Sequence, residues 1–255
     1  MSVTDLSSLI DREFPLSEEI CYLNHAAVAP WPKRTTQAVI DFANENSVTG
    51  AQHYPNWLRV ENQLRNQLKN LIGARSAEEI ALTKSTSEAL SFIAYGLVWR
   101  EGDEIVICDQ EFPSNRIVWE SLTTKFGVRV VVVNISAQKC PEQAIIDSLT
   151  AKTRLVSLSS VQYGTGFKLN LGPIGDELRR RKILFCVDAI QSVGVCPINV
   201  EDDCIDFLMA DGHKWMLGPE GLALFYIRKP LQDLLNLTEY GWHMVKNRGD
   251  YTRKT

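Results

Sequence analysis

From residue 78 onward the sequence alternates short apolar runs with helix-like segments, and this alternation is the strongest constraint on the fold. The apolar runs cover 79–83, 104–109, 128–133, 154–159, 183–188, 206–210 and 222–227. Helical segments fall at 87–99, 115–126, 141–149 and 173–182. This order is typical of βαβ units, and runs without polar alternation indicate strands buried on both faces. We therefore predict an α/β fold with a mostly parallel seven-stranded sheet covered by helices.

Three helical patterns precede the sheet, at about 4–14, 32–50 and 57–73. Pro32 is favoured in the first turn of a helix, and Gly73 is a common residue after the last turn. No repeat or low-complexity linker interrupts the chain. We predict an N-terminal segment over residues 1–30 and one large domain over residues 31–255.

Charge and composition exclude several classes of partner. The 27 basic and 31 acidic residues are interspersed, so no basic surface for nucleic acid is expected. The N-terminus lacks an apolar secretory segment, and the longest apolar runs are too short to span a membrane. Six cysteines without C-x-x-C spacing indicate reduced thiols of a cytoplasmic protein and no metal site. The expected partner is a small molecule or another protein chain.

Polar and aromatic residues follow several predicted strands, where ligands of open α/β sheets bind. Ser85, Thr86 and Ser87 follow the first run, at the start of a helix. Their hydroxyl groups either cap that helix or, with its free N–H groups, hold a phosphate. Phe112 follows the second run, either as a packed hydrophobic residue or as a ring that stacks on a flat ligand.

Two charged residues lie at later strand ends. Asp188 follows a buried run, where a carboxylate is costly unless it caps the next segment or meets a cation. Gln191 follows closely enough to reach the same ligand. Lys214 lies beside His213 in the turn A-D-G-H-K-W-M-L-G-P-E-G. It is either a solvated surface lysine or a partly desolvated amine that attacks carbonyl groups.

The four strand ends together match the groups of one cofactor. Hydroxyl groups suit a phosphate, an aromatic ring covers a pyridine, an acid pairs with a ring nitrogen, and a lysine reacts with an aldehyde. Pyridoxal 5′-phosphate (PLP) carries all four groups, and its enzymes combine a lysine Schiff base with an acidic partner for the pyridinium nitrogen. The combination predicts a PLP site, although each signal alone is unspecific.

Five stretches occur in an order known from one family of PLP enzymes. They are Y-L-N-H-A-A-V-A-P (22–30), T-K-S-T-S-E-A-L (83–90), E-F-P-S-N (111–115), V-D-A-I-Q-S-V-G (187–194) and D-G-H-K-W-x-L-G-P-E-G (211–221). They resemble the class V aminotransferase family of fold-type I, and most of all its branch of cysteine desulfurases and isopenicillin N epimerase-like proteins. The resemblance implies the large domain of a PLP-dependent enzyme that acts on an amino acid and forms a homodimer.

The resemblance also implies a role for each candidate residue. Lys214 would form the Schiff base and move the proton at Cα, and Asp188 would pair with the pyridinium nitrogen. Gln191 would bond the ring hydroxyl, and Phe112 would stack on the ring. The other implied residues bind the phosphate (Thr86, Ser87, His213), line the cofactor edge (Gln162), face the substrate (Asn24, His25) or reach the partner subunit's site (240–242).

Three features depart from the family pattern. Phe112 stands where desulfurases usually have a stacking histidine, and phenylalanine cannot carry protons. Asp211 stands where they often have serine or threonine, so we expect its carboxylate to point away from the phosphate or to pair with a cation. Relatives continue into a small C-terminal domain that supplies an arginine and, in desulfurases, a reactive cysteine. We expect this domain to be missing here.

Three alternatives remain open on the sequence alone. The first is a truncated, inactive relative that binds cofactor or acts as a dimerising partner. The second is a cysteine desulfurase-like lyase. The third is an ordinary nucleotide-binding domain, for which G-T-G at 164–166 is too short a fingerprint.

Overall fold

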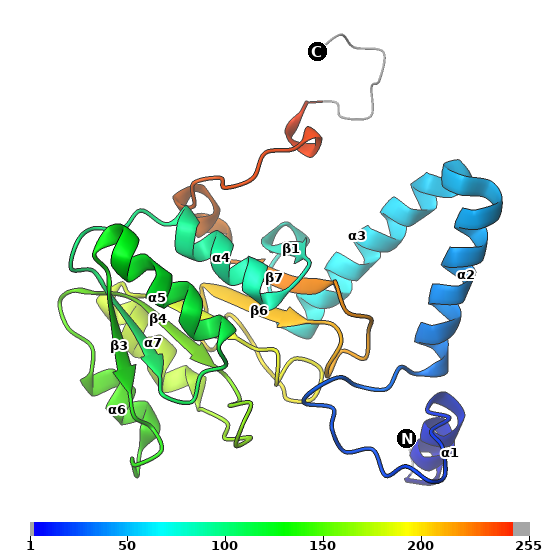
Figure 1. Ribbon diagram of the computed structural model, residues 1–255, viewed down its shortest axis with the longest axis horizontal. Coiled ribbons are helices and arrows are strands. Elements are labelled where there is room, and N and C mark those ends of the chain that lie inside the picture. Colours follow the sequence, from blue (N-terminus) through cyan, green and yellow to red (C-terminus); the bar gives the residue numbers. More distant parts are fainter. Residues whose placement is uncertain (1–2, 247–255) are drawn as a thin grey trace.

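The computed structural model describes residues 3–246 and contains the expected mostly parallel sheet, which confirms the predicted α/β fold (Figure 1). The strands are β1 (Ile80–Thr83), β2 (Glu104–Cys108), β3 (Arg129–Val133), β4 (Thr153–Ser159), β5 (Leu184–Asp188), β6 (Phe207–Asp211) and β7 (Ala223–Ile227). Their order across the sheet is β1-β7-β6-β5-β4-β2-β3. β7 runs antiparallel to both of its neighbours, β1 and β6. The other pairings in this sheet are parallel.

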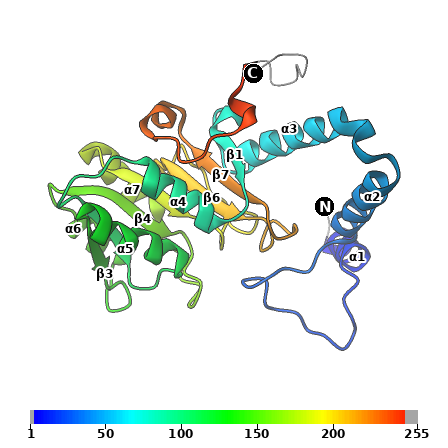
Figure 2. The same cartoon turned by 45° about the horizontal axis from the view of Figure 1, so that its top comes forward.

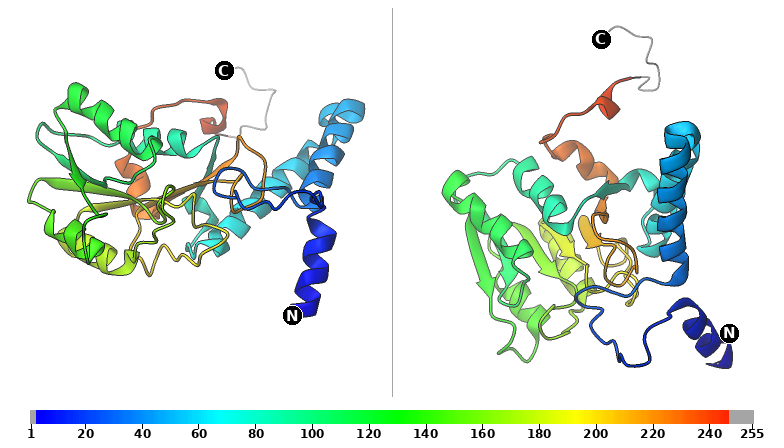
Figure 3. Two further views of the ribbon diagram at one scale, coloured as in Figure 1. Left: turned by 60° about the horizontal axis from the view of Figure 1, so that its bottom comes forward. Right: turned by 45° about the vertical axis from the view of Figure 1, so that its right-hand side comes forward.

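Helices cover both faces of the sheet (left view of Figure 3). On one face lie α4 (Thr86–Gly96) and α5 (Ser114–Phe126), which bury side chains such as Leu90 and Trp119. On the other lie α6 (Pro141–Asp147), α7 (Leu171–Arg181) and the end of α3 (Tyr54–Leu71). The observed helices begin and end close to the bounds that the sequence predicted.

The burial of β2 explains why the strands read as unbroken apolar runs. Ile105 and Ile107 belong to the core under α4 and α5, whereas Val106 and Cys108 belong to the core on the opposite face. Successive side chains of a strand point to opposite faces. A strand with helices on both sides therefore buries side chains at successive positions, which favours apolar residues there.

A helical arm projects from the sheet (Figure 2). It consists of α2 (Lys33–Thr49), the 3₁₀ helix η1 (Gly50–His53) and the outer part of α3, and no residue of α2 is buried. Before it come α1 (Val3–Glu13) and a segment that returns to the sheet, where the Ala29 N–H donates to the His213 carbonyl oxygen at 2.8 Å. The remaining 3₁₀ helices are η2 (Ala77–Glu79), η3 (Lys229–Leu234) and η4 (Trp242–Met244).

The division into residues 1–30 and 31–255 stays a prediction, and residues 247–255 lie outside the described part of the chain. Within residues 3–246, no helix combines the length and apolar character that crossing a membrane requires.

Candidate functional site

The ends of β5 and β6 bring Asp188 and Lys214 to one site. Asp188 is the last residue of β5, and Lys214 lies in the turn that follows β6. These strands are parallel neighbours, so their carboxyl ends open at the same edge of the sheet. The two side chains interact electrostatically, because the Asp188 carboxylate acts to raise the pKa of Lys214. Two residues that lie 26 positions apart in the sequence are therefore close enough in the structure to interact.

Backbone contacts hold the turn that carries Lys214. The Gly218 N–H donates to the Gly212 carbonyl oxygen at 2.8 Å, and this bond closes the turn around the lysine. Gly194 has φ of +102°, and a Cβ atom there would lie 2.3 Å from the Trp215 carbonyl oxygen. Only glycine allows this conformation and this approach, so the loops after β5 and β6 pack at backbone contact.

Asp188 is a buried carboxylate with few groups around it that would stabilise its negative charge. It is 2% exposed, and among residues 3–246 its carboxylate accepts one hydrogen bond, from the Ile190 N–H at 3.1 Å. Burial raises the pKa of Asp188 to about 7; the Ile190 bond and Lys214 oppose this rise, and Glu111 and Asp211 add to it. No described cation lies within ion-pair distance of Asp188, so its charged form calls for a further positive group.

Lys214 is half-buried beneath an aromatic ring. Burial lowers its pKa, and the carboxylates of Asp188 and Asp211 act against that shift. The Lys214 ammonium lies 5.8 Å from the centroid of the Phe112 ring, which in turn meets Tyr163 edge-on at 5.1 Å. The structure thus places the aromatic ring of Phe112 and the buried acid Asp188 close to the Lys214 amine.

Asp211 binds the N-terminus of α4, a contact that the sequence did not predict. The N–H and the hydroxyl of Thr86 both donate to Asp211 Oδ1, the hydroxyl at 2.8 Å. The positive end of a helix attracts a carboxylate, which explains this contact. His213 Nδ1 lies 3.7 Å from Asp211 Oδ2, while Ser87 is exposed and donates to the Ser114 hydroxyl at 2.9 Å.

Gln191 ties the N-terminal segment to the lysine turn. Its Nε2 donates to the Ala26 carbonyl oxygen at 2.9 Å, and its Oε1 accepts from the Trp215 indole at 2.9 Å. The His25 ring stacks on Trp215 with centroids 5.4 Å apart, whereas Asn24 is exposed on the same segment. Both ends of the Gln191 amide are therefore bonded within the protein, and its role toward a ring hydroxyl stays a prediction.

Gln162 and Glu111 are buried near the same edge. Gln162 donates from Nε2 to the Ser159 carbonyl oxygen at 3.2 Å, and its Oε1 is buried without a partner in the described chain. Glu111 lies directly before Phe112 and accepts several hydrogen bonds, but it was not among the predicted site residues. Its place in the stretch E-F-P-S-N was the only signal for it.

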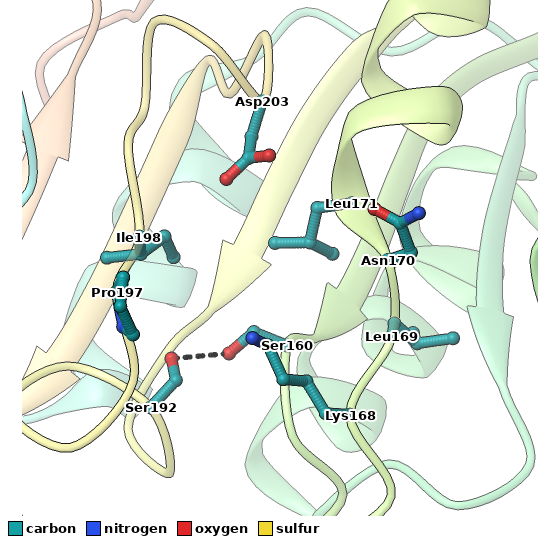
Figure 4. A pocket seen from close by; sticks show the side chains of 9 residues that line it. All are labelled: Ser160, Lys168, Leu169, Asn170, Leu171, Ser192, Pro197, Ile198 and Asp203. Atoms are coloured by element: carbon teal, nitrogen blue, oxygen red, sulfur yellow. Dashed lines mark hydrogen bonds between the residues drawn. The ribbon is translucent and has the colours of Figure 1, made fainter.

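A separate pocket of about 310 Å³ opens beside the end of β4 (Figure 4). The Ser160 and Ser192 hydroxyl groups, which line it, are hydrogen-bonded at 2.7 Å and join β4 to the loop after β5. None of the predicted site residues lines this pocket.

Within the described part of the chain, no cluster of three metal-ligating side chains occurs.

A family model described as aminotransferase class V matches residues 21–253. The chain therefore belongs to the class V aminotransferase family, as the sequence motifs predicted.

Known relatives extend beyond the length of this chain. A probable cysteine desulfurase of Methanothermobacter thermautotrophicus is 32% identical over 227 residues, which are 88% of this chain and 56% of that protein. Two solved structures of C-DES have TM-scores of 0.85 and 0.84 at 25% and 26% identity, and the matches cover 92% of this chain and 63% and 64% of theirs. The chain thus spans less than two thirds of these relatives.

The two C-DES structures were solved with different bound ligands. One is a mutant with glycine covalently linked to the PLP cofactor, and the other is a complex of this cystine C–S lyase with its reaction product, cysteine persulfide. The similarities confirm the predicted fold-type I architecture and PLP as the cofactor of this family.

The raised pKa of Asp188 predicts a pH-dependent loss of stability in the cofactor-free protein. Its folded-state pKa of about 7 exceeds the ordinary value of 3.8. The protonated carboxyl group therefore contributes fully to the free energy of unfolding below about pH 4, and this contribution is lost as the pH rises through 7. Between about pH 5 and pH 8, wild type should lose about 2.5 kcal/mol more unfolding free energy than Asp188→Asn. Urea unfolding at both pH values measures this difference, and equal losses in the two proteins contradict the assignment.

Proposed function

We propose that this chain is the PLP-binding large domain of an enzyme that acts on an amino acid, with Lys214 as the residue that attaches the cofactor. The observation that carries this proposal is the buried Asp188 carboxylate, which lacks a cation at ion-pair distance and faces the half-buried amine of Lys214. An acid and an amine held in this way match the ring nitrogen and the aldehyde of PLP.

The residues present fit the ring end of PLP well. A pyridinium nitrogen supplies the positive group that Asp188 lacks, and Phe112 offers an aromatic surface over the same space. The buried Gln162 Oε1 could accept a hydrogen bond, because no described group donates to it. At the phosphate end, Ser87 and His213 would supply donors, while Asp211 already holds the donors of Thr86.

The chain's own residues define how the chemistry would be supported. Bound PLP supplies an electron-withdrawing ring that weakens the bonds at Cα of an amino acid. Asp188 would hold the proton on the ring nitrogen through a charge-assisted hydrogen bond. Burial lowers the pKa of Lys214, so a larger fraction of its amine is neutral and able to attack an aldehyde or to take a proton from Cα.

Borohydride reduction tests the proposed attachment. Wild type incubated with PLP and reduced should gain one phosphopyridoxyl group on the peptide that contains Lys214, because reduction makes the link permanent. Lys214→Ala should gain none, whereas Lys168→Ala, at the separate pocket of Figure 4, should be labelled like wild type. Peptide mass spectrometry locates the label, and labelling of Lys214→Ala at wild-type levels contradicts the proposal.

A second candidate is the cleavage of a C–S bond in a sulfur-containing amino acid. It is favoured by relatives described as cysteine desulfurase and cystine C–S lyase. Incubation of the PLP-loaded protein with L-cysteine or L-cystine should then release sulfide or persulfide at a rate that falls at least about a hundredfold in Lys214→Ala. Deuterium exchange at Cα without sulfur release would instead indicate another reaction.

An inactive cofactor-binding relative is the remaining alternative. It predicts labelling of Lys214 with neither sulfur release nor Cα exchange for any amino acid. The homodimer stays a prediction of the family resemblance, and Tyr240 and Trp242, expected near the partner's site, are both exposed.

A further inference from the structure

Glu111 is a buried carboxylate at the same edge of the sheet as Asp188. Its side chain is surrounded by donors: the Ser159 N–H at 2.9 and 3.0 Å, the Ser159 hydroxyl, and Asn115 Nδ2 at 2.7 Å. Gln162 lies close enough to act to lower the pKa of Glu111. No described lysine, arginine or histidine pairs with Glu111 at ion-pair distance. These contacts resemble the environment of an anion rather than that of a neutral acid.

The orientation of its partners indicates that Glu111 is ionised. A backbone N–H can only donate, so the Ser159 N–H requires an acceptor. Trp119 Nε1, also only a donor, points at Asn115 Oδ1 at 3.0 Å, and this fixes Asn115 with its Nδ2 toward Glu111. Burial raises the pKa of Glu111, and the donated hydrogen bonds oppose this rise. Among these partners only the Ser159 hydroxyl can reverse its direction, so the other donors favour the charged form.

The sheet places this charge beside Asp188. Ser159 in β4 is the register partner of Asp188 in β5, and partners on adjacent parallel strands lie about 4.8 Å apart with side chains on the same face. Since the Ser159 hydroxyl faces Glu111, Glu111 and Asp188 lie on the same face. The charged groups that act on Asp188 are the carboxylates of Glu111 and Asp211 and the Lys214 ammonium.

We propose that Glu111 is a positioning residue that acts through Asp188, and that its fixed negative charge makes the site select a protonated ring nitrogen over an uncharged ring. This inference rests on the proposed PLP function. Two neighbouring carboxylates attract a cation more strongly than one does, especially where water is excluded. The bonds from Ser159 to Glu111 also fix the end of β4 against which Asp188 is held.

A PLP analogue with carbon in place of the ring nitrogen separates charge from shape. Dissociation constants for PLP and this analogue are measured at pH 8 by fluorescence for wild type, Glu111→Gln and Ser159→Ala. Glu111→Gln should lower the preference for PLP over the analogue by about tenfold, the equivalent of one pKa unit. Ser159→Ala keeps the carboxylate and removes one of its donors, so it should lower the preference less than Glu111→Gln does.

The outcomes separate this inference from the proposed function. An unchanged preference in Glu111→Gln overturns the role of Glu111 and leaves the PLP site intact. A wild type that binds both compounds equally refutes the contact between Asp188 and the ring nitrogen, and the role of Glu111 with it.

Should Glu111→Gln fail to fold, infrared spectroscopy of the wild-type protein tests the same charge. Glutamate labelled with ¹³C identifies the carbonyl stretch of any neutral glutamic acid. The absence of such a band at pH 8 supports an ionised Glu111, and its presence overturns the proposal.

Discussion

A buried carboxylate without an adjacent cation is the constraint on which the site depends. Asp188 ends a strand that is covered on both faces, and burial raises its pKa to about 7. A protein rarely keeps such a group unless a positive partner compensates it. Lys214 supplies part of that compensation from the neighbouring strand end, and a pyridinium nitrogen is the partner that we propose for the rest.

Backbone and side-chain contacts hold the loops that carry this acid and this amine against each other. Gly194 lets the loop after β5 approach the Trp215 carbonyl oxygen, and Gln191 links the same loop to Trp215 and to Ala26. The N-terminal segment is thereby joined to the lysine turn, although it is far away in the sequence. Positioning of Lys214 therefore depends on three separate parts of the chain.

The sequence was sufficient to predict the strands and the residues that gather at their ends. The unbroken apolar run before Asp188 reflects burial on both faces, and a carboxyl edge shared by parallel strands brings Asp188, Phe112 and Lys214 together. What it could not predict were hydrogen bonds between distant segments. The bonds from Thr86 to Asp211 and from Ser159 to Glu111 join residues that no local pattern relates. The projection of α2 and α3 away from the sheet could not be predicted either, because the apolar spacing indicates a helix but not the direction in which it runs.

A crystal structure of the protein grown with PLP is the most direct measurement of the proposed site. We predict continuous density from Lys214 Nζ to the cofactor, with the ring nitrogen at hydrogen-bond distance from the Asp188 carboxylate. Cofactor bound elsewhere, for example in the pocket of Figure 4, or a ring whose nitrogen points away from Asp188, would contradict it.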